Sequence, residues 1–84
     1  MNDVQWTPKA LRQARKLPPA EQGHIADAVS ALRYWPHVEQ VKALRDKPGY
    51  RLRVGRYRVL FTVRTGIPLV VRIEEVKKRD EHTY

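Results

Sequence analysis

The sequence predicts an α+β fold, a small antiparallel β-sheet with an N-terminal helical hairpin on one face, in the order β-α-α-β-β-β. Two observations lead to this prediction. Apolar residues recur at helical spacing between residues 8 and 35, and from residue 50 onward they alternate with polar residues, as in half-buried strands. The 84 residues, without repeat or low-complexity segment, predict one domain spanning 1–84.

A short strand and a helix are predicted at the N-terminus. Val4 and Trp6 alternate with polar neighbours, which is typical of a strand. Thr7 is a suitable N-cap, and Pro8 fits the first helical position, where its missing N–H has no consequence. Helical spacing of apolar residues continues until Pro18-Pro19, which ends this first helix.

A second helix is predicted from about Pro19 to Trp35. Its apolar stripe repeats at i, i+3, i+4 and i+7, the best-formed amphipathic pattern in the chain: Ile25, Ala28, Val29 and Leu32. Trp35 precedes Pro36, and a residue before proline is disfavoured in helical geometry. The two helices therefore form a hairpin that needs an apolar surface to cover.

Residues 50–63 predict a β-hairpin. Alternating apolar positions run through Tyr50, Leu52, Val54, Tyr57, Val59, Phe61 and Val63. The alternation breaks at Gly55-Arg56, which indicates a tight turn. Before the hairpin, 41–44 is a candidate short extended piece and 47–49 a turn; after it, 65–68 is another turn and 69–76 a strand apolar enough to be central.

Arginines occupy the other face of this hairpin. Arg51, Arg53 and Arg58 alternate with the apolar residues, and Arg56 lies at the turn, so four arginines fall within eight residues without an acid among them. The positive charges on such a surface repel one another. This repulsion favours the interpretation that a polyanion or an acidic partner covers the surface, over the interpretation of a merely solvated sheet face. Tyr50, Tyr57 and Phe61, by contrast, are predicted to face the core, as are Trp6 and Trp35.

The charge balance also indicates an anionic partner. The chain has 17 basic and 9 acidic residues, a net charge of +8. Residues 1–41 hold five basic and four acidic residues, net +1, whereas residues 42–84 hold twelve and five, net +7. The function that depends on positive charge therefore belongs to the second half of the chain. Its candidate partners are nucleic acid, an anionic surface or an acidic protein.

Several function classes are disfavoured by composition. With no cysteine and three scattered histidines, there is no metal-ligand spacing, and no cofactor is predicted. No apolar run approaches the roughly 20 residues needed to cross a bilayer, so no membrane partner is expected. The N-terminus lacks the pattern of a secretory signal, which predicts a cytoplasmic protein.

Three motifs resemble the RelE/ParE superfamily, the small toxins of bacterial type II toxin–antitoxin modules. They are residues 4–10 (VQWTPKA), residues 49–61 (GYRLRVGRYRVLF) and residues 76–84 (VKKRDEHTY). The similarity covers nearly the whole chain. The middle motif is fairly specific for the superfamily, whose members nevertheless act on different targets.

The resemblance to the RelE branch implies cleavage of messenger RNA in the ribosomal A site, by attack of a ribose 2′-OH on the adjacent phosphate. By position, Arg51 and Arg53 match the paired lysines of that branch, and Arg58 matches the arginine that holds the scissile phosphate. Arg79 and Tyr84 match its C-terminal arginine and tyrosine. Arg56, Lys77 and Lys78 are further candidates for phosphate contacts, although the two lysines also fit a solvated tail.

Proton transfer is where the chain departs from this pattern. An arginine side chain keeps its proton at physiological pH, so Arg51 and Arg53 suit phosphate binding rather than acid–base catalysis. His82 is an added candidate, because related branches place a histidine beside the terminal tyrosine and because the ordinary pKa of histidine, about 6.5, suits that chemistry. The spacing from Arg79 to Tyr84 also differs slightly from the usual pattern.

The implied partners are the 70S ribosome with its mRNA and an antitoxin whose acidic segment folds onto the basic face, giving a toxin–antitoxin hetero-oligomer. The alternative within the superfamily is a ParE-like inhibitor of DNA gyrase, which acts by binding protein and needs no nuclease site. A third reading is a nucleic-acid-binding module without toxicity. Arg79 together with Tyr84 favours the nuclease.

Overall fold

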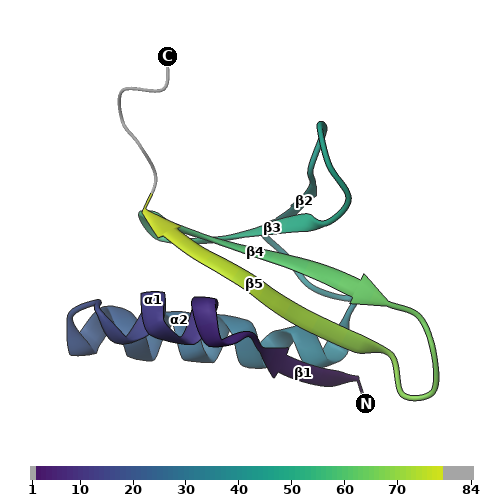
Figure 1. Ribbon diagram of the computed structural model, residues 1–84, viewed down its shortest axis with the longest axis horizontal. Coiled ribbons are helices and arrows are strands. Elements are labelled where there is room, and N and C mark those ends of the chain that lie inside the picture. Colours follow the sequence, from purple (N-terminus) through teal and green to yellow (C-terminus); the bar gives the residue numbers. More distant parts are fainter. Residues whose placement is uncertain (1, 79–84) are drawn as a thin grey trace.

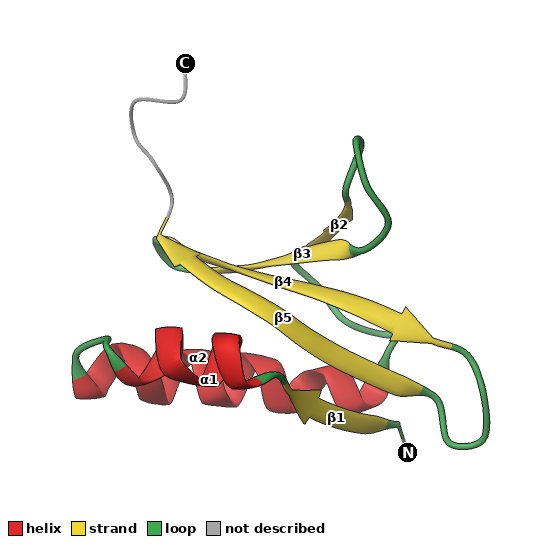
Figure 2. Cartoon of the chain, in the orientation of Figure 1, coloured by secondary structure: helices red, strands yellow, loops and turns green. Residues whose placement is uncertain are grey.

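Two helices lie across one face of a five-stranded sheet (Figures 1 and 2). The computed structural model describes residues 2–78. Its elements are β1 (Asp3–Trp6), α1 (Pro8–Arg15), α2 (Pro19–Ser30), the 3-10 turn η1 (Ala31–Tyr34), β2 (Val41–Ala43), β3 (Tyr50–Val54), β4 (Tyr57–Arg64) and β5 (Val70–Lys78). This confirms the predicted α+β class and element order, and the extended piece near residue 42 is a true strand.

The sheet is mixed, with the strand order β1-β5-β4-β3-β2. β5 lies between β1 and β4, so the strand predicted to be central is internal to the sheet, although β4 occupies the middle. The expectation of a wholly antiparallel sheet was wrong for β1, which runs parallel to β5 from Asp3 opposite Val70 to Trp6 opposite Ile73. The helical hairpin that follows β1 provides the long connection that a parallel neighbour requires.

Thr7 links the start of α1 to β5. Its hydroxyl accepts a hydrogen bond from the Ala10 N–H (3.2 Å) and donates one to the Ile73 carbonyl (2.8 Å). Thr7 is thus the predicted N-cap, and Pro8 is in the first helical turn. Further along α1, the Gln13 side-chain oxygen accepts from the Val76 N–H at 2.7 Å, so α1 covers the edge of β5 beyond the end of β1.

The second helix is shorter than predicted. α2 ends at Ser30 and continues as the 3-10 turn η1, so regular α-helix does not reach Trp35. The predicted stripe nevertheless faces the sheet: Ile25, Val29 and Leu32 have 1%, 2% and 0% exposure.

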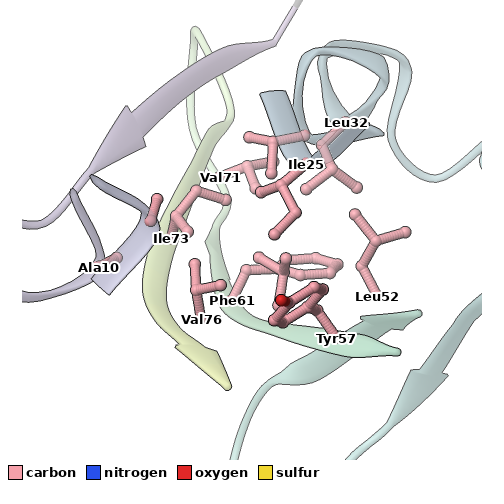
Figure 3. Packing of buried hydrophobic residues seen from close by; sticks show 12 residues of the cluster. Ala10, Ile25, Leu32, Leu52, Tyr57, Phe61, Val71, Ile73 and Val76 are labelled. Carbon is pink, nitrogen blue, oxygen red and sulfur yellow. The ribbon is translucent and has the colours of Figure 1, made fainter. Parts of the chain in front are cut away.

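The core lies between the helices and the sheet (Figure 3). Phe61 of β4 is 1% exposed, and it packs against the half-buried rings of Trp35 and Tyr50, with ring centroids 5.5 Å apart in both pairs. Trp6 is also half-buried against this cluster. The predicted core roles of these aromatic residues are therefore confirmed.

A β-bulge in β5 decides which residues face away from the helices. Leu60 pairs with Glu75 and Phe61 pairs with Ile73, which leaves Glu74 as the extra residue. The side-chain alternation of β5 changes phase there, so Ile73 and Val76 are both buried although three residues separate them. We call the side of the sheet away from the helices the open face; by register it carries Arg51, Arg53, Arg58, Leu60, Glu75 and Lys77.

Candidate nucleic-acid interface

The arginine hairpin forms as the sequence predicts. Val54 pairs with Tyr57 across a two-residue turn, and Gly55 has φ = 57° while Arg56 stays at negative φ, the pattern of a type II′ turn. Leu52, Tyr57 and Val59 are buried on the helix side. The arginines between them consequently lie on the open face.

A row of cations crosses three strands of the open face. Arg53 of β3 is opposite Arg58 of β4, which is opposite Lys77 of β5. Neighbouring strands are about 4.8 Å apart, so the three side chains start close together on one surface. Among the ion pairs of residues 2–78, none involves Arg51, Arg53 or Arg58. The carboxylates of the described part of the chain therefore leave these guanidinium groups unneutralised.

A groove of about 540 Å³ lies between the open face and the β2–β3 connection. Figure 1 shows this connection rising on the side of the sheet away from the helices. We call it the basic groove, because its lining includes seven cations and one carboxylate: Lys42, Arg45, Lys47, Arg51, Arg58, Lys77, Lys78 and Asp46. Leu60, 9% exposed, lines it as well. Such a surface suits a chain of phosphates.

Gly49 fixes how the connection approaches the sheet. It has φ = 120°, and a Cβ placed there would lie 2.9 Å from the Phe61 carbonyl oxygen. Any other residue would therefore be strained and would clash with β4. The Leu44 N–H also donates to the Gly49 carbonyl at 3.0 Å, which closes the base of the connection.

Comparison with known proteins places this fold. No family model and no curated protein sequence matches the chain. Among solved structures, a chain of the toxin–antitoxin complex RelBE2 from Mycobacterium tuberculosis matches with a TM-score of 0.79 and 27% identity, over 93% of this chain and 98% of that one. A chain of the intact E. coli RelBE toxin–antitoxin complex matches with a TM-score of 0.75 and 25% identity, over 96% and 100%.

The chain belongs to the RelE/ParE superfamily. The resemblance predicted from the three sequence motifs is thereby confirmed. The YoeB/ParE toxin from Agrobacterium tumefaciens shares the fold, with a TM-score of 0.75 and 11% identity over 93% of this chain and 99% of that one. Because the fold extends to a protein so distant in sequence, the choice between the RelE and ParE branches has to rest on the site.

The structure brings together part of the RelE-like residue set predicted from the sequence. Arg51, Arg58, Lys77 and Lys78 line the basic groove. Arg53 shares the open face and adjoins Arg58 but does not line the groove, and Arg56 is exposed at the turn. The remaining predicted residues, Arg79, His82 and Tyr84, lie outside the described residues.

Sequence reasoning missed the far wall of the groove in this RelE/ParE chain. Arg45 and Lys47 in the β2–β3 connection line the groove together with the hairpin arginines, and so does Lys42 of β2, which pairs with Arg51. The +7 charge of residues 42–84 was the available signal, because these three cations belong to it. The alternation that located the hairpin arginines has no counterpart in an irregular connection.

Acidic side chains border this surface on β5. Glu74 accepts a hydrogen bond from the Thr62 hydroxyl (2.8 Å), and its carboxylate lies 3.6 Å from Arg72. Glu75 pairs with Lys9 at 3.0 Å and with Lys77 at 3.7 Å. The hydrogen bond from Lys9, more than the charge of Lys77, holds the pKa of Glu75 below its ordinary value, against an opposing effect of burial.

Two further observations concern metal ions and membranes. Within residues 2–78, no three histidine or carboxylate side chains gather closely enough to hold a metal ion. Over the same part of the chain, no helix is long and apolar enough to cross a membrane.

Proposed function

We propose that this chain is the toxin of a toxin–antitoxin module and that it cleaves messenger RNA in the ribosomal A site. The observation that carries the proposal is the basic groove, which joins Arg51, Arg58 and Lys77 on a face that the helices leave open. The RelE-like likeness of the fold supports the toxin assignment.

The groove arginines would bind the scissile phosphate. A guanidinium group donates two parallel hydrogen bonds to phosphate oxygens, and it keeps its charge throughout the reaction. As the ribose 2′-oxygen bonds to phosphorus, negative charge develops on the phosphate oxygens, and Arg51 and Arg58 would stabilise it. The bond from phosphorus to the 5′-oxygen then breaks, leaving a 2′,3′-cyclic phosphate.

Two proton transfers complete this reaction. The 2′-OH must lose a proton to a base, and the departing 5′-oxygen must gain one from an acid. We assign these transfers to Tyr84 and His82, with Arg79 assisting at the phosphate or the leaving group. All of these groups are protein side chains, so the proposed reaction proceeds without a metal ion.

The 70S ribosome would supply much of the substrate positioning. A domain of this size has few groups with which to orient RNA, and orientation contributes a large part of catalytic rate enhancement. The proposed protein partner is an antitoxin whose acidic segment covers the basic groove. RelBE2 and RelBE are toxin–antitoxin complexes, which supports an antitoxin as the partner of this chain.

A translation reaction with purified ribosomes tests the proposal. The expected result is message cut within the A-site codon. Intact message would overturn the nuclease assignment. Inhibition of DNA gyrase supercoiling by the same preparation would then support the ParE-like alternative.

A further inference from the structure

Glu75 is a carboxylate next to a surface that otherwise attracts anions. By register it lies on the open face opposite Leu60, which lines the basic groove, and one row from the Arg58–Lys77 pair. Its side chain is 17% exposed. A carboxylate at this position repels a phosphate chain, so its presence requires an explanation other than binding strength.

The contacts of Glu75 are unequal. Its Oε1 atom lies 3.0 Å from the Lys9 Nζ, within hydrogen-bond distance, but 3.7 Å from the Lys77 Nζ, which is a looser ion pair. Lys9 belongs to α1 and does not line the groove, whereas Lys77 does. Lys77 is therefore the partner that a bound phosphate can take from Glu75, and Lys9 is the partner that remains.

We propose that Glu75 competes with nucleic acid for Lys77 and thereby lowers the affinity of the basic groove for free single strands. Lys9 keeps the carboxylate neutralised while Lys77 turns to a phosphate. The inference rests on the proposed function for its ligand, a single-stranded RNA, but it concerns binding rather than cleavage.

Selectivity follows from how the weakening acts on different ligands. A groove lined by seven cations binds any phosphate chain, and cellular RNA offers a great excess of such chains. An internal competitor reduces binding to a free strand, whose contacts are confined to the groove. A message held by the ribosome makes further contacts, so it stays bound after an equal loss, whereas occupancy of the groove by a weakly bound free strand falls in proportion to the lost affinity. Glu75 thus favours the assembled substrate.

Binding of a labelled RNA whose 2′-hydroxyls are all methylated, so that it cannot be cleaved, tests the inference. The wild-type chain and Glu75→Gln are compared by fluorescence anisotropy across a salt series. The variant is expected to bind about two- to five-fold more tightly, the range of a weak ion pair at the protein surface. Its log–log salt slope should steepen by up to about 0.7, one more phosphate contact.

Glu39→Gln is the matched control. Glu39 is exposed in the segment before β2, does not line the groove, and gives the same change in net charge. A gain at Glu75 no larger than the gain at Glu39 would overturn the inference, since only the general charge would then matter. Weaker binding by Glu75→Gln would overturn it as well.

Lys77→Met, introduced both into the wild-type chain and into Glu75→Gln, tests whether Glu75 acts through Lys77. If Glu75 acts through Lys77, the gain from Glu75→Gln disappears when Lys77 is methionine; a gain that persists contradicts the proposed route. Thermal unfolding of each variant confirms that it is folded. Because no ribosome or cleavage enters this assay, tighter binding by Glu75→Gln sustains the inference even if the nuclease assignment fails.

Discussion

The two faces of the sheet differ in this molecule: one packs against the helices, and the other carries exposed cations. On β4, Val59 is fully buried against the helices, while Arg58 beside it in sequence lies on the open face. The same backbone hydrogen bonds hold both. Apolar burial on one side can therefore stabilise the fold while the other side carries many charges of the same sign. This separation predicts that substitutions on the helix-covered face lower the free energy of unfolding, whereas substitutions on the open face reduce activity.

The largest effect is expected on the helix-covered face. Phe61→Ala removes a ring that is 1% exposed and that contacts Trp35 and Tyr50. It should lower the free energy of unfolding by about 3–5 kcal/mol, measured by urea denaturation. Phe61→Leu is the milder control. A loss below about 1 kcal/mol for the alanine variant would show that the core does not depend on this face as described.

On the open face, Arg58→Ala should reduce ribosome-dependent cleavage by about 10²–10³-fold, the typical cost of removing one group that stabilises transition-state charge. Its free energy of unfolding should change by no more than about 0.5 kcal/mol. Arg58→Lys, which keeps the charge but loses the two-pronged geometry, should fall between. Arg15→Ala, an exposed position on α1, serves as the control for net charge. Normal cleavage by Arg58→Ala would contradict the assignment.

A smaller effect is expected where the helices join the sheet. Thr7→Ala removes the N-cap of α1 and the hydrogen bond to the Ile73 carbonyl. It should lower the free energy of unfolding by about 1–2 kcal/mol, whereas Thr7→Ser, which keeps the hydroxyl, should lose less. Equal losses in the two variants would show that the methyl group, not the hydroxyl, is responsible.

The smallest effect is the pH dependence contributed by Glu75. Its pKa in the folded chain lies below the ordinary 4.5, so the ionised carboxylate stabilises the fold above that pH. This stabilisation is lost as the pH falls through the folded pKa. Between about pH 6 and pH 3, the free energy of unfolding of Glu75→Gln should therefore decline less than that of the wild-type chain. Parallel curves would contradict the Lys9–Glu75 contact.

The features that the sequence predicted correctly arise from local pattern. Alternation placed Leu52 and Phe61 in the core and the arginines on the other face of the sheet. The break in that alternation placed the turn at Gly55. Thr7 followed by Pro8 identified the start of α1. Each of these signals acts between residues a few positions apart, which is why a single sequence reveals it.

The features that were missed depend on contacts between distant segments. The parallel pairing of β1 with β5 joins residues almost seventy positions apart, as in Asp3 opposite Val70. The bulge at Glu74, which turns Glu75 and Lys77 to the open face, exists only relative to β4. The far wall of the groove, with Arg45, is placed by Gly49 fitting against Phe61. No local pattern encodes any of these.

The pairing of β1 with β5 also has a consequence for synthesis. The strand nearest the beginning of the chain finds its neighbour only after β5 has been translated, because the internal position of β5 joins β1 to the rest of the sheet. Lys77, which completes the cationic row, arrives with that same strand. A nascent chain therefore lacks both its complete sheet and its full anion-binding surface until β5 has been translated.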